Sequence, residues 1–151
     1  MPMIYIRYKI ASYARKWVGT PFSNGGRKNG IGCDCLGLFI GVAKRFHFRS
    51  LYEDKLISAF DTTAYHYLED SKKLEHEINK HLIKIDAPRV GSIALISNQN
   101  ISHIGIVADY INNKSLFSLI HASIERRLVI EHRLIFEERY AYFDFKELYY
   151  L

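Results

Sequence analysis

The chain has 151 residues, of which 48% are hydrophobic and 25% are charged, a composition typical of one globular domain. Its 21 Lys and Arg against 16 Asp and Glu leave a net charge of +5, which favours an anionic partner such as nucleic acid, an anionic membrane surface or an acidic polymer. We expect no secretory signal peptide, because Arg7 and Lys9 interrupt the first apolar stretch. We expect no transmembrane segment either, because the longest stretch without Asp, Glu, Lys or Arg, 90–108, is rich in polar residues. The sequence thus predicts a single domain, 1–151, made in the cytoplasm.

Two amphipathic helices are expected in the first third of the chain. Apolar residues over 5–17 recur at spacings of three and four, and the sequence Gly-Thr-Pro at 19–21 ends this stripe. The segment 23–32 has four glycines and no apolar rhythm, which indicates a loop. A second apolar stripe covers 36–43, and Asp34 stands before it as an N-cap. Cys35 therefore falls in the first turn of the second helix.

The remaining chain changes from helical to strand periodicity. The segment 45–88 alternates charged and aromatic residues and is expected to form helices and loops, with one helix marked by Leu74, Ile78 and Leu82. From Val90 the apolar period is two, and we expect strands over 92–96, 102–109, 115–123 and 127–134. The aromatic end, 140–151, is expected to pack back on the domain. Helices followed by strands indicate an α+β fold in which N-terminal helices pack on an antiparallel sheet.

Cys35 has the surroundings of a reactive thiol. Unpaired backbone amides and the helix dipole at a helix start stabilise a thiolate, and Cys33, two residues earlier, meets this condition less well. A single residue between them makes a disulfide unfavourable, so both are expected to be free thiols. The alternative is that Cys35 is only a small buried apolar residue. A base close to Cys35 in the fold would favour its interpretation as a nucleophile over that of a buried apolar residue.

Two of the seven histidines stand out, because His103 opens a predicted strand and His121 ends one. If these strands form a hairpin centred on Asn112, the two histidines are direct cross-strand neighbours. One imidazole can then act as a base while the other orients it. The four histidines between 47 and 81 lie in the charged segment and are expected at the surface.

Two alternatives remain for the paired histidines. The first is that each histidine is a half-satisfied polar group of the core. A structural zinc site formed with Cys33 and Cys35 is the second, although the spacer between these cysteines is shorter than is usual for zinc ligands.

Several segments around these residues resemble the NlpC/P60 cysteine peptidases, in particular the phage-type branch. The nucleophile region of that family resembles Trp17-Val18-Gly19-Thr20-Pro21-Phe22, Gly25-Gly26 and Gly32-Cys33-Asp34-Cys35-Leu36-Gly37-Leu38. Its base and third-residue strands resemble Arg89-Val90-Gly91-Ser92-Ile93-Ala94-Leu95, His103-Ile104-Gly105-Ile106-Val107 and Ile120-His121-Ala122-Ser123. Val129-Ile130-Glu131-His132 is similar to a strand common in the phage-type branch. The resemblance covers about half of the chain.

The resemblance implies a reduced papain-like α+β domain that hydrolyses peptide stems of peptidoglycan, commonly between D-glutamate and the diamino acid. It implies that Cys35 is the nucleophile, His103 the general base and His121 the residue that orients it, with no metal or cofactor. Many family members have tyrosine where Phe22 stands, near the nucleophile. Phe22, Asp34 and Ser102 are therefore the candidates for substrate contacts, and 45–88 is expected to select the substrate.

A cell-wall peptidase without a signal peptide is expected on a phage tail or a related gene-transfer particle, where it would act in the periplasm or cell wall beside other tail-tip proteins. Two alternatives stay open: a catalytically silent structural protein of the tail tip, and an amidase or acyltransferase that uses the same Cys-His pair. Nucleic acid is not an expected partner, because no DNA- or RNA-binding signature accompanies the positive charge.

Overall fold

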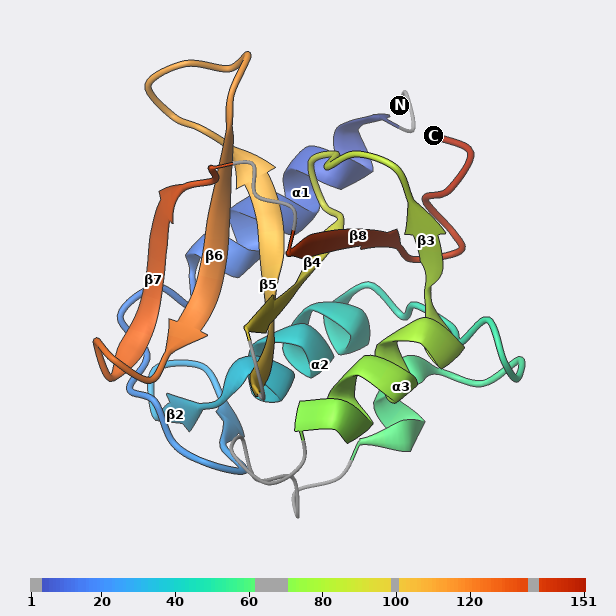
Figure 1. The fold of residues 1–151 in the computed structure, drawn as a ribbon, viewed down its shortest axis with the longest axis horizontal. Helices are drawn as coiled ribbons and strands as arrows, with labels where there is room; N and C mark the ends of the chain where they lie inside the picture. The colour runs from blue at the N-terminus through green and yellow to red at the C-terminus, as the bar shows by residue number, and fades with distance from the viewer. Residues whose placement is uncertain (1–3, 62–70, 99–100, 136–138) are drawn as a thin grey trace.

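The computed structural model describes residues 4–61, 71–98, 101–135 and 139–151, which form helices around an antiparallel sheet (Figure 1). The main sheet has the strand order β3-β8-β4-β5-β6-β7, and β1 and β2 form a separate ribbon. The predicted α+β class and antiparallel sheet are confirmed. The elements in chain order are α1 (Ile4–Arg15), β1 (Arg27–Lys28), β2 (Gly32–Cys33), α2 (Cys35–Arg45), the 3₁₀ helix η1 (Ile57–Phe60), α3 (Ser71–His81), β3 (Ile83–Ile85), β4 (Ile93–Asn98), β5 (Ile101–Asp109), β6 (Phe117–Ser123), β7 (Leu128–Arg133) and β8 (Tyr140–Asp144).

The three predicted helices are confirmed as α1, α2 and α3, each close to its predicted bounds. In α3, Leu74 and Ile78 are buried and Leu82 follows the last turn, as their spacing of four predicts. None of the helices in the described part of the chain has the length and apolar character needed to span a bilayer.

The four predicted strands are confirmed as β4 to β7, but two further strands correct the prediction. β3 lies in the segment expected to form only helices and loops, and its three residues are too few to show a period. β8 falls in the aromatic C-terminal stretch and pairs with both β3 and β4. Its sequence, YAYFD, has little apolar–polar alternation because β8 lies inside the sheet.

The sheet carries a large apolar cluster on one face and a small one on the other. Apolar side chains of α1 and α2 pack with Ile104, Ile106 and Ile120 in the large cluster, and Figure 1 shows α1 crossing behind β5 and β6. The small cluster comprises Ala94, Val107, Leu119, Leu134 and Tyr142. Adjacent residues of a strand point to opposite faces. His103 and His121 therefore share the face of Val107 and Leu119.

An extended segment, 19–23, joins the start of α2 to the end of the sheet. On one side Gly19 N donates to Val129 O and Phe22 N donates to Arg127 O, each at 2.9 Å. On the other side Cys33 N donates to Pro21 O at 3.0 Å. The segment thus lies between β7 and β2, and it holds the residues just before α2 beside the sheet.

Candidate functional site

Cys35 is the first residue of α2, as predicted, and its side chain is 1% exposed. Apart from the amide that its N-cap satisfies, the backbone amides of the first helical turn lack partners within the helix. Together with the helix dipole they favour negative charge at this position. α2 packs against β5 and β6, the strands that carry His103 and His121, and Figure 1 shows α2 beginning near the lower ends of both strands.

Asp34 caps α2 and fixes the preceding loop. Its carboxylate is fully buried and accepts hydrogen bonds from Gly37 N at 2.7 Å, Gly25 N at 2.8 Å and Arg27 Nη1 at 3.0 Å. The loop lies so close to the helix that a Cβ at Gly37 would collide with the Gly26 carbonyl oxygen. The N-cap prediction is confirmed, and a role of Asp34 in substrate binding stays a prediction.

Cys33 and Cys35 are both buried, and neither forms a disulfide. Burial, with the Asp34 carboxylate adding to it, raises the pKa of Cys33 to about 12. A thiol with this pKa stays protonated at neutral pH, and the thiolate is the nucleophilic form of cysteine. Cys33 is therefore unsuited to nucleophilic chemistry.

His103 and His121 lie in direct contact, since His103 Nε2 and His121 Nδ1 are 2.8 Å apart. The predicted contact is confirmed, but the predicted register is wrong. A hairpin centred on Asn112 would pair Val107 with Phe117, whereas Val107 pairs with Leu119. A slip of two residues leaves every side chain on its face, so the histidines still meet, but along a diagonal rather than directly across the strands.

Both imidazoles are held neutral. Burial, reinforced by His121, lowers the pKa of His103 to about 3. Burial and the neighbouring His132 lower the pKa of His121 to about 4. At neutral pH each ring therefore has one N–H and one lone pair, and a neutral imidazole can accept a proton from a thiol.

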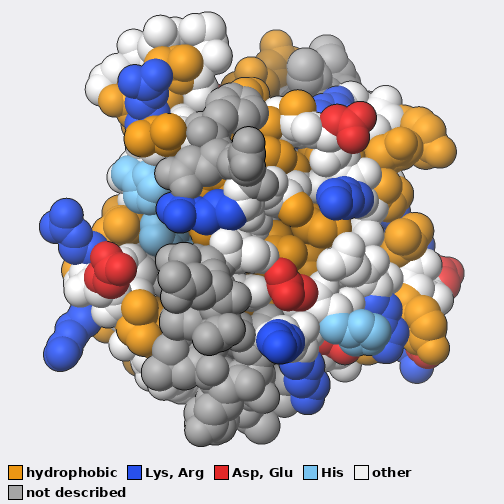
Figure 2. Space-filling model, in the orientation of Figure 1, with side chains coloured by type: hydrophobic (Ala, Val, Ile, Leu, Met, Phe, Trp, Pro, Cys, Tyr) orange, Lys and Arg blue, Asp and Glu red, His pale blue; other side chains and the backbone are white. Residues whose placement is uncertain are grey.

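A third histidine, His132 on β7, extends this contact and was not singled out by the sequence. Its Nε2 lies 2.9 Å from His121 Nε2, and its Nδ1 lies 3.0 Å from the carbonyl oxygen of Arg133. Figure 2 shows histidine side chains gathered at the surface over β6 and β7. Strand alternation places His121 and His132 on one face, but only the β6–β7 register, which pairs His121 with Ile130, brings them together.

The other two predicted substrate-contact residues lie near the same elements. Phe22 is half-buried, packs against the large cluster and forms a parallel bridge with Cys33. Ser102 is 4% exposed and pairs with Ser97 of β4. Because Ser102 precedes His103 in a strand, its side chain points to the opposite face of the sheet.

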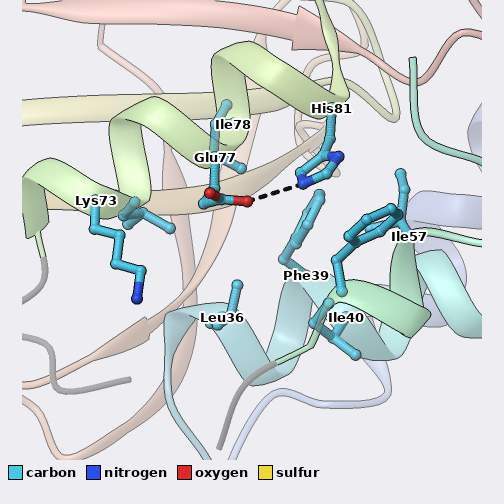
Figure 3. A pocket seen from close by; sticks show the side chains of 10 residues that line it. Leu36, Phe39, Ile40, Ile57, Lys73, Glu77, Ile78 and His81 are labelled. Carbon is cyan, nitrogen blue, oxygen red and sulfur yellow. Dashed lines mark hydrogen bonds and ion pairs between the residues drawn. The ribbon is translucent and has the colours of Figure 1, made fainter. Parts of the chain in front are cut away.

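A pocket of about 230 Å³ lies between α2, η1 and α3 (Figure 3). Its walls are mainly apolar, and Leu36, the residue after Cys35, is one of them. Two charged side chains of α3, Lys73 and Glu77, also line it, and Figure 3 shows Lys73 extending from α3 in the direction of α2. Glu77 Oε2 lies 2.9 Å from His81 Nε2. The pocket thus brings part of the segment 45–88 next to the start of α2.

Within the described residues, no group of three or more His, Cys, Asp or Glu side chains is arranged to hold a metal ion. The nitrogen atoms of the three histidines contact one another at 2.8 and 2.9 Å instead, which is hydrogen-bond spacing.

Comparison with known proteins identifies the fold. No protein-family model matches the sequence, and no curated protein matches it either. Among solved structures, the NlpC/p60 domain of the peptidoglycan hydrolase SagA is similar, with a TM-score of 0.57 and 17% sequence identity over 89% of this chain and 95% of that one. The chain has an NlpC/p60-like fold. At this identity the likeness concerns the fold, and any statement on chemistry depends on the residues themselves.

Proposed function

We propose that the protein is a cysteine peptidase that hydrolyses the peptide stems of peptidoglycan. Cys35 is the nucleophile, His103 the general base, and His121 the residue that orients the base. The observation that carries this proposal is the 2.8 Å contact between His103 Nε2 and His121 Nδ1, toward the ends of β5 and β6 near which α2 begins with Cys35 (Figure 1). The NlpC/p60-like fold supports the choice of substrate, because the similar domain belongs to a peptidoglycan hydrolase.

The reaction proceeds by acyl transfer. His103 takes the proton of the Cys35 thiol, and the thiolate attacks the carbonyl carbon of the scissile amide. Backbone amides at the start of α2 stabilise the oxyanion. His103 returns the proton to the leaving amine as the C–N bond breaks and a thioester forms. Water, deprotonated by the same imidazole, then attacks the thioester, which releases the acid and restores the thiol.

The proposal also names the bond that is cleaved and the particle that carries the protein. We assign the bond between D-glutamate and the diamino acid, and we place the protein on a phage tail or a related particle that acts at the cell wall. The resemblance of Val129-Ile130-Glu131-His132 to a strand of phage-type NlpC/P60 peptidases supports this assignment. The alternative, a catalytically silent tail-tip protein, would have the same fold but would not cleave peptidoglycan.

The pocket beside α2 is the proposed binding site for a part of the substrate next to the scissile bond. Leu36, the residue after Cys35, lines the pocket, and Lys73 and Glu77 add charged groups to its wall. Both features support this assignment. Peptidoglycan stems carry carboxylates, and those containing a diamino acid also carry an amine, so both signs of charge have a partner.

Product analysis separates the proposed reaction from its alternatives. Purified protein is incubated with a muropeptide that carries an L-Ala-γ-D-Glu-diaminopimelate stem, with and without an added amine, and products are identified by mass spectrometry. Two fragments whose masses sum to the substrate plus one water, split after glutamate, support the proposal. Transfer of the acyl group to the amine indicates an acyltransferase, and intact substrate indicates a silent protein.

A further inference from the structure

The three imidazoles of His103, His121 and His132 form a continuous hydrogen-bonded chain that ends on a backbone carbonyl. The nitrogen pairs lie 2.8 Å apart between His103 and His121 and 2.9 Å apart between His121 and His132, and His132 Nδ1 lies 3.0 Å from Arg133 O. A neutral imidazole has one donor nitrogen and one acceptor nitrogen. The chain can therefore have only one direction at a time.

The carbonyl at the end of the chain sets this direction. A carbonyl oxygen only accepts, so Nδ1 of His132 is the N–H donor and its Nε2 has the lone pair. His121 Nε2–H then donates to His132, which leaves the lone pair of His121 on Nδ1. His103 Nε2–H in turn donates to His121 Nδ1. The lone pair of His103 is thereby placed on Nδ1.

We propose that His132 is a positioning residue that, through His121, keeps the proton of His103 on Nε2 and its lone pair on Nδ1. This inference builds on the proposed function, in which His103 is the base that takes the thiol proton. If the lone pair of His103 faced His121, it would accept the hydrogen bond from His121 and could not take the thiol proton. His132 thus acts on the reaction without touching the substrate, by fixing the tautomer of the residue that does.

The surroundings of His132 separate this role from a contribution to folding. The side chain is exposed and belongs to neither apolar cluster. The neighbouring charged residue of β7, Glu131, points to the other face, where it binds Arg15 of α1 and Ser118 of β6. β7 is therefore anchored by Glu131, and substitutions at His132 are expected to leave the fold intact.

Long-range ¹H–¹⁵N correlation spectra of the histidine rings test the chain without any substrate. In the full-length protein at pH 7, His103 and His121 are expected as Nε2–H tautomers and His132 as the Nδ1–H tautomer. Single substitutions of each histidine assign the signals. A His103 ring protonated on Nδ1 would overturn the proposal.

Two substitutions that differ in hydrogen bonding test the consequence for turnover. His132→Gln retains an acceptor oxygen for His121, whereas His132→Lys offers only N–H donors and opposes the native direction. We expect His132→Gln to keep at least half of the wild-type kcat. We expect His132→Lys to lower kcat about tenfold with an unchanged KM, and to move the His103 proton to Nδ1. Ile135→Lys, at a position that is 64% exposed, adds the same charge nearby as a control.

The readouts distinguish failure of this inference from failure of the proposed function. If wild type cleaves the muropeptide and needs Cys35, but the Gln and Lys variants have equal kcat and equal tautomers, the role of His132 is refuted alone. If neither wild type nor any variant cleaves the muropeptide, but His132→Lys moves the His103 proton to Nδ1, the peptidase function fails. Control of the His103 tautomer by His132 is then upheld.

Discussion

The buried imidazole of His103 couples the stability of the protein to pH. Its pKa is about 3 in the folded protein and about 6.5 in an unfolded chain. Between these values the unfolded state binds one more proton, so the free energy of unfolding falls as the pH is lowered below about 6.5, by about 1.4 kcal/mol per pH unit from this group. His121, with a pKa of about 4, acts in the same direction.

Urea denaturation at pH 7, 6, 5 and 4.5 measures this dependence. Wild type is expected to lose stability at each step below pH 6.5, and His103→Asn is expected to show a shallower dependence. A free energy of unfolding for wild type that stays constant from pH 7 to 4.5 would contradict the assignment of a buried neutral histidine pair.

The two cysteines show what the sequence can decide at the residue scale. The position of Cys35 after an N-cap residue is visible in the sequence and is confirmed. The raised pKa of Cys33 is not visible in the sequence, because it depends on burial and on the Asp34 carboxylate. His132 is likewise missed, since its contact with His121 requires a register that turn length alone does not determine.

At the scale of elements, the start of α2 depends on Asp34. Replacing it with alanine removes the cap on Gly37 and the acceptor of Gly25 N. It also removes one of the carboxylates that pair with Arg27. Loss of a cap costs about 1 kcal/mol, and loss of buried charged hydrogen bonds costs about 1.5–3 kcal/mol. We expect Asp34→Ala to lower the free energy of unfolding by about 2–4 kcal/mol in urea denaturation.

A second aspartate paired with an arginine supplies the control for this experiment. Asp54 is 82% exposed and lies 3.4 Å from Arg49, so its pair is worth less than about 1 kcal/mol. Asp54→Ala is expected to change stability by less than about 0.5 kcal/mol. Equal losses for the two substitutions would show that the cap does not hold the helix start.

The pocket between α2, η1 and α3 gives a prediction for substrate binding. If Lys73 binds a carboxylate of the peptide stem, Lys73→Ala should raise KM by about fivefold, the effect of roughly 1 kcal/mol, and leave kcat unchanged. The increase should shrink as salt is added, because salt screens exposed charges. Lys72, the preceding residue, is exposed and does not line the pocket. A KM for Lys72→Ala as high as that for Lys73→Ala would contradict the assignment.

Long periodic elements were predictable from the sequence, and short or fully enclosed ones were not. α1, α2, α3 and β4 to β7 have clear apolar periods and were predicted. β3 has three residues, and β8 lies between two strands, so neither shows a period. The β5–β6 hairpin was predicted with the correct faces, but its turn is centred on Asn113, where Leu116 N donates to Asn113 O, rather than on Asn112.

At the scale of the whole molecule, the ends of the chain are fastened together. Arg7 of α1 forms a buried ion pair with Asp144 of β8 at 2.8 Å and donates to Leu148 O at 2.7 Å. The C-terminal strand thereby joins the first helix to the sheet. No sequence pattern predicts a contact between residues so far apart in the chain. The pocket is not predictable either, because its walls come from three separate elements.

The central claim is that Cys35, and not Cys33, performs covalent catalysis in an NlpC/p60-like fold. The most direct test compares initial rates of muropeptide cleavage by wild type, Cys35→Ala and Cys33→Ala, with thermal unfolding as a check on folding. The account predicts that Cys35→Ala loses at least a thousandfold in rate, whereas Cys33→Ala keeps a rate within a few fold of wild type. A folded Cys35→Ala protein that cleaves at the wild-type rate would contradict the account.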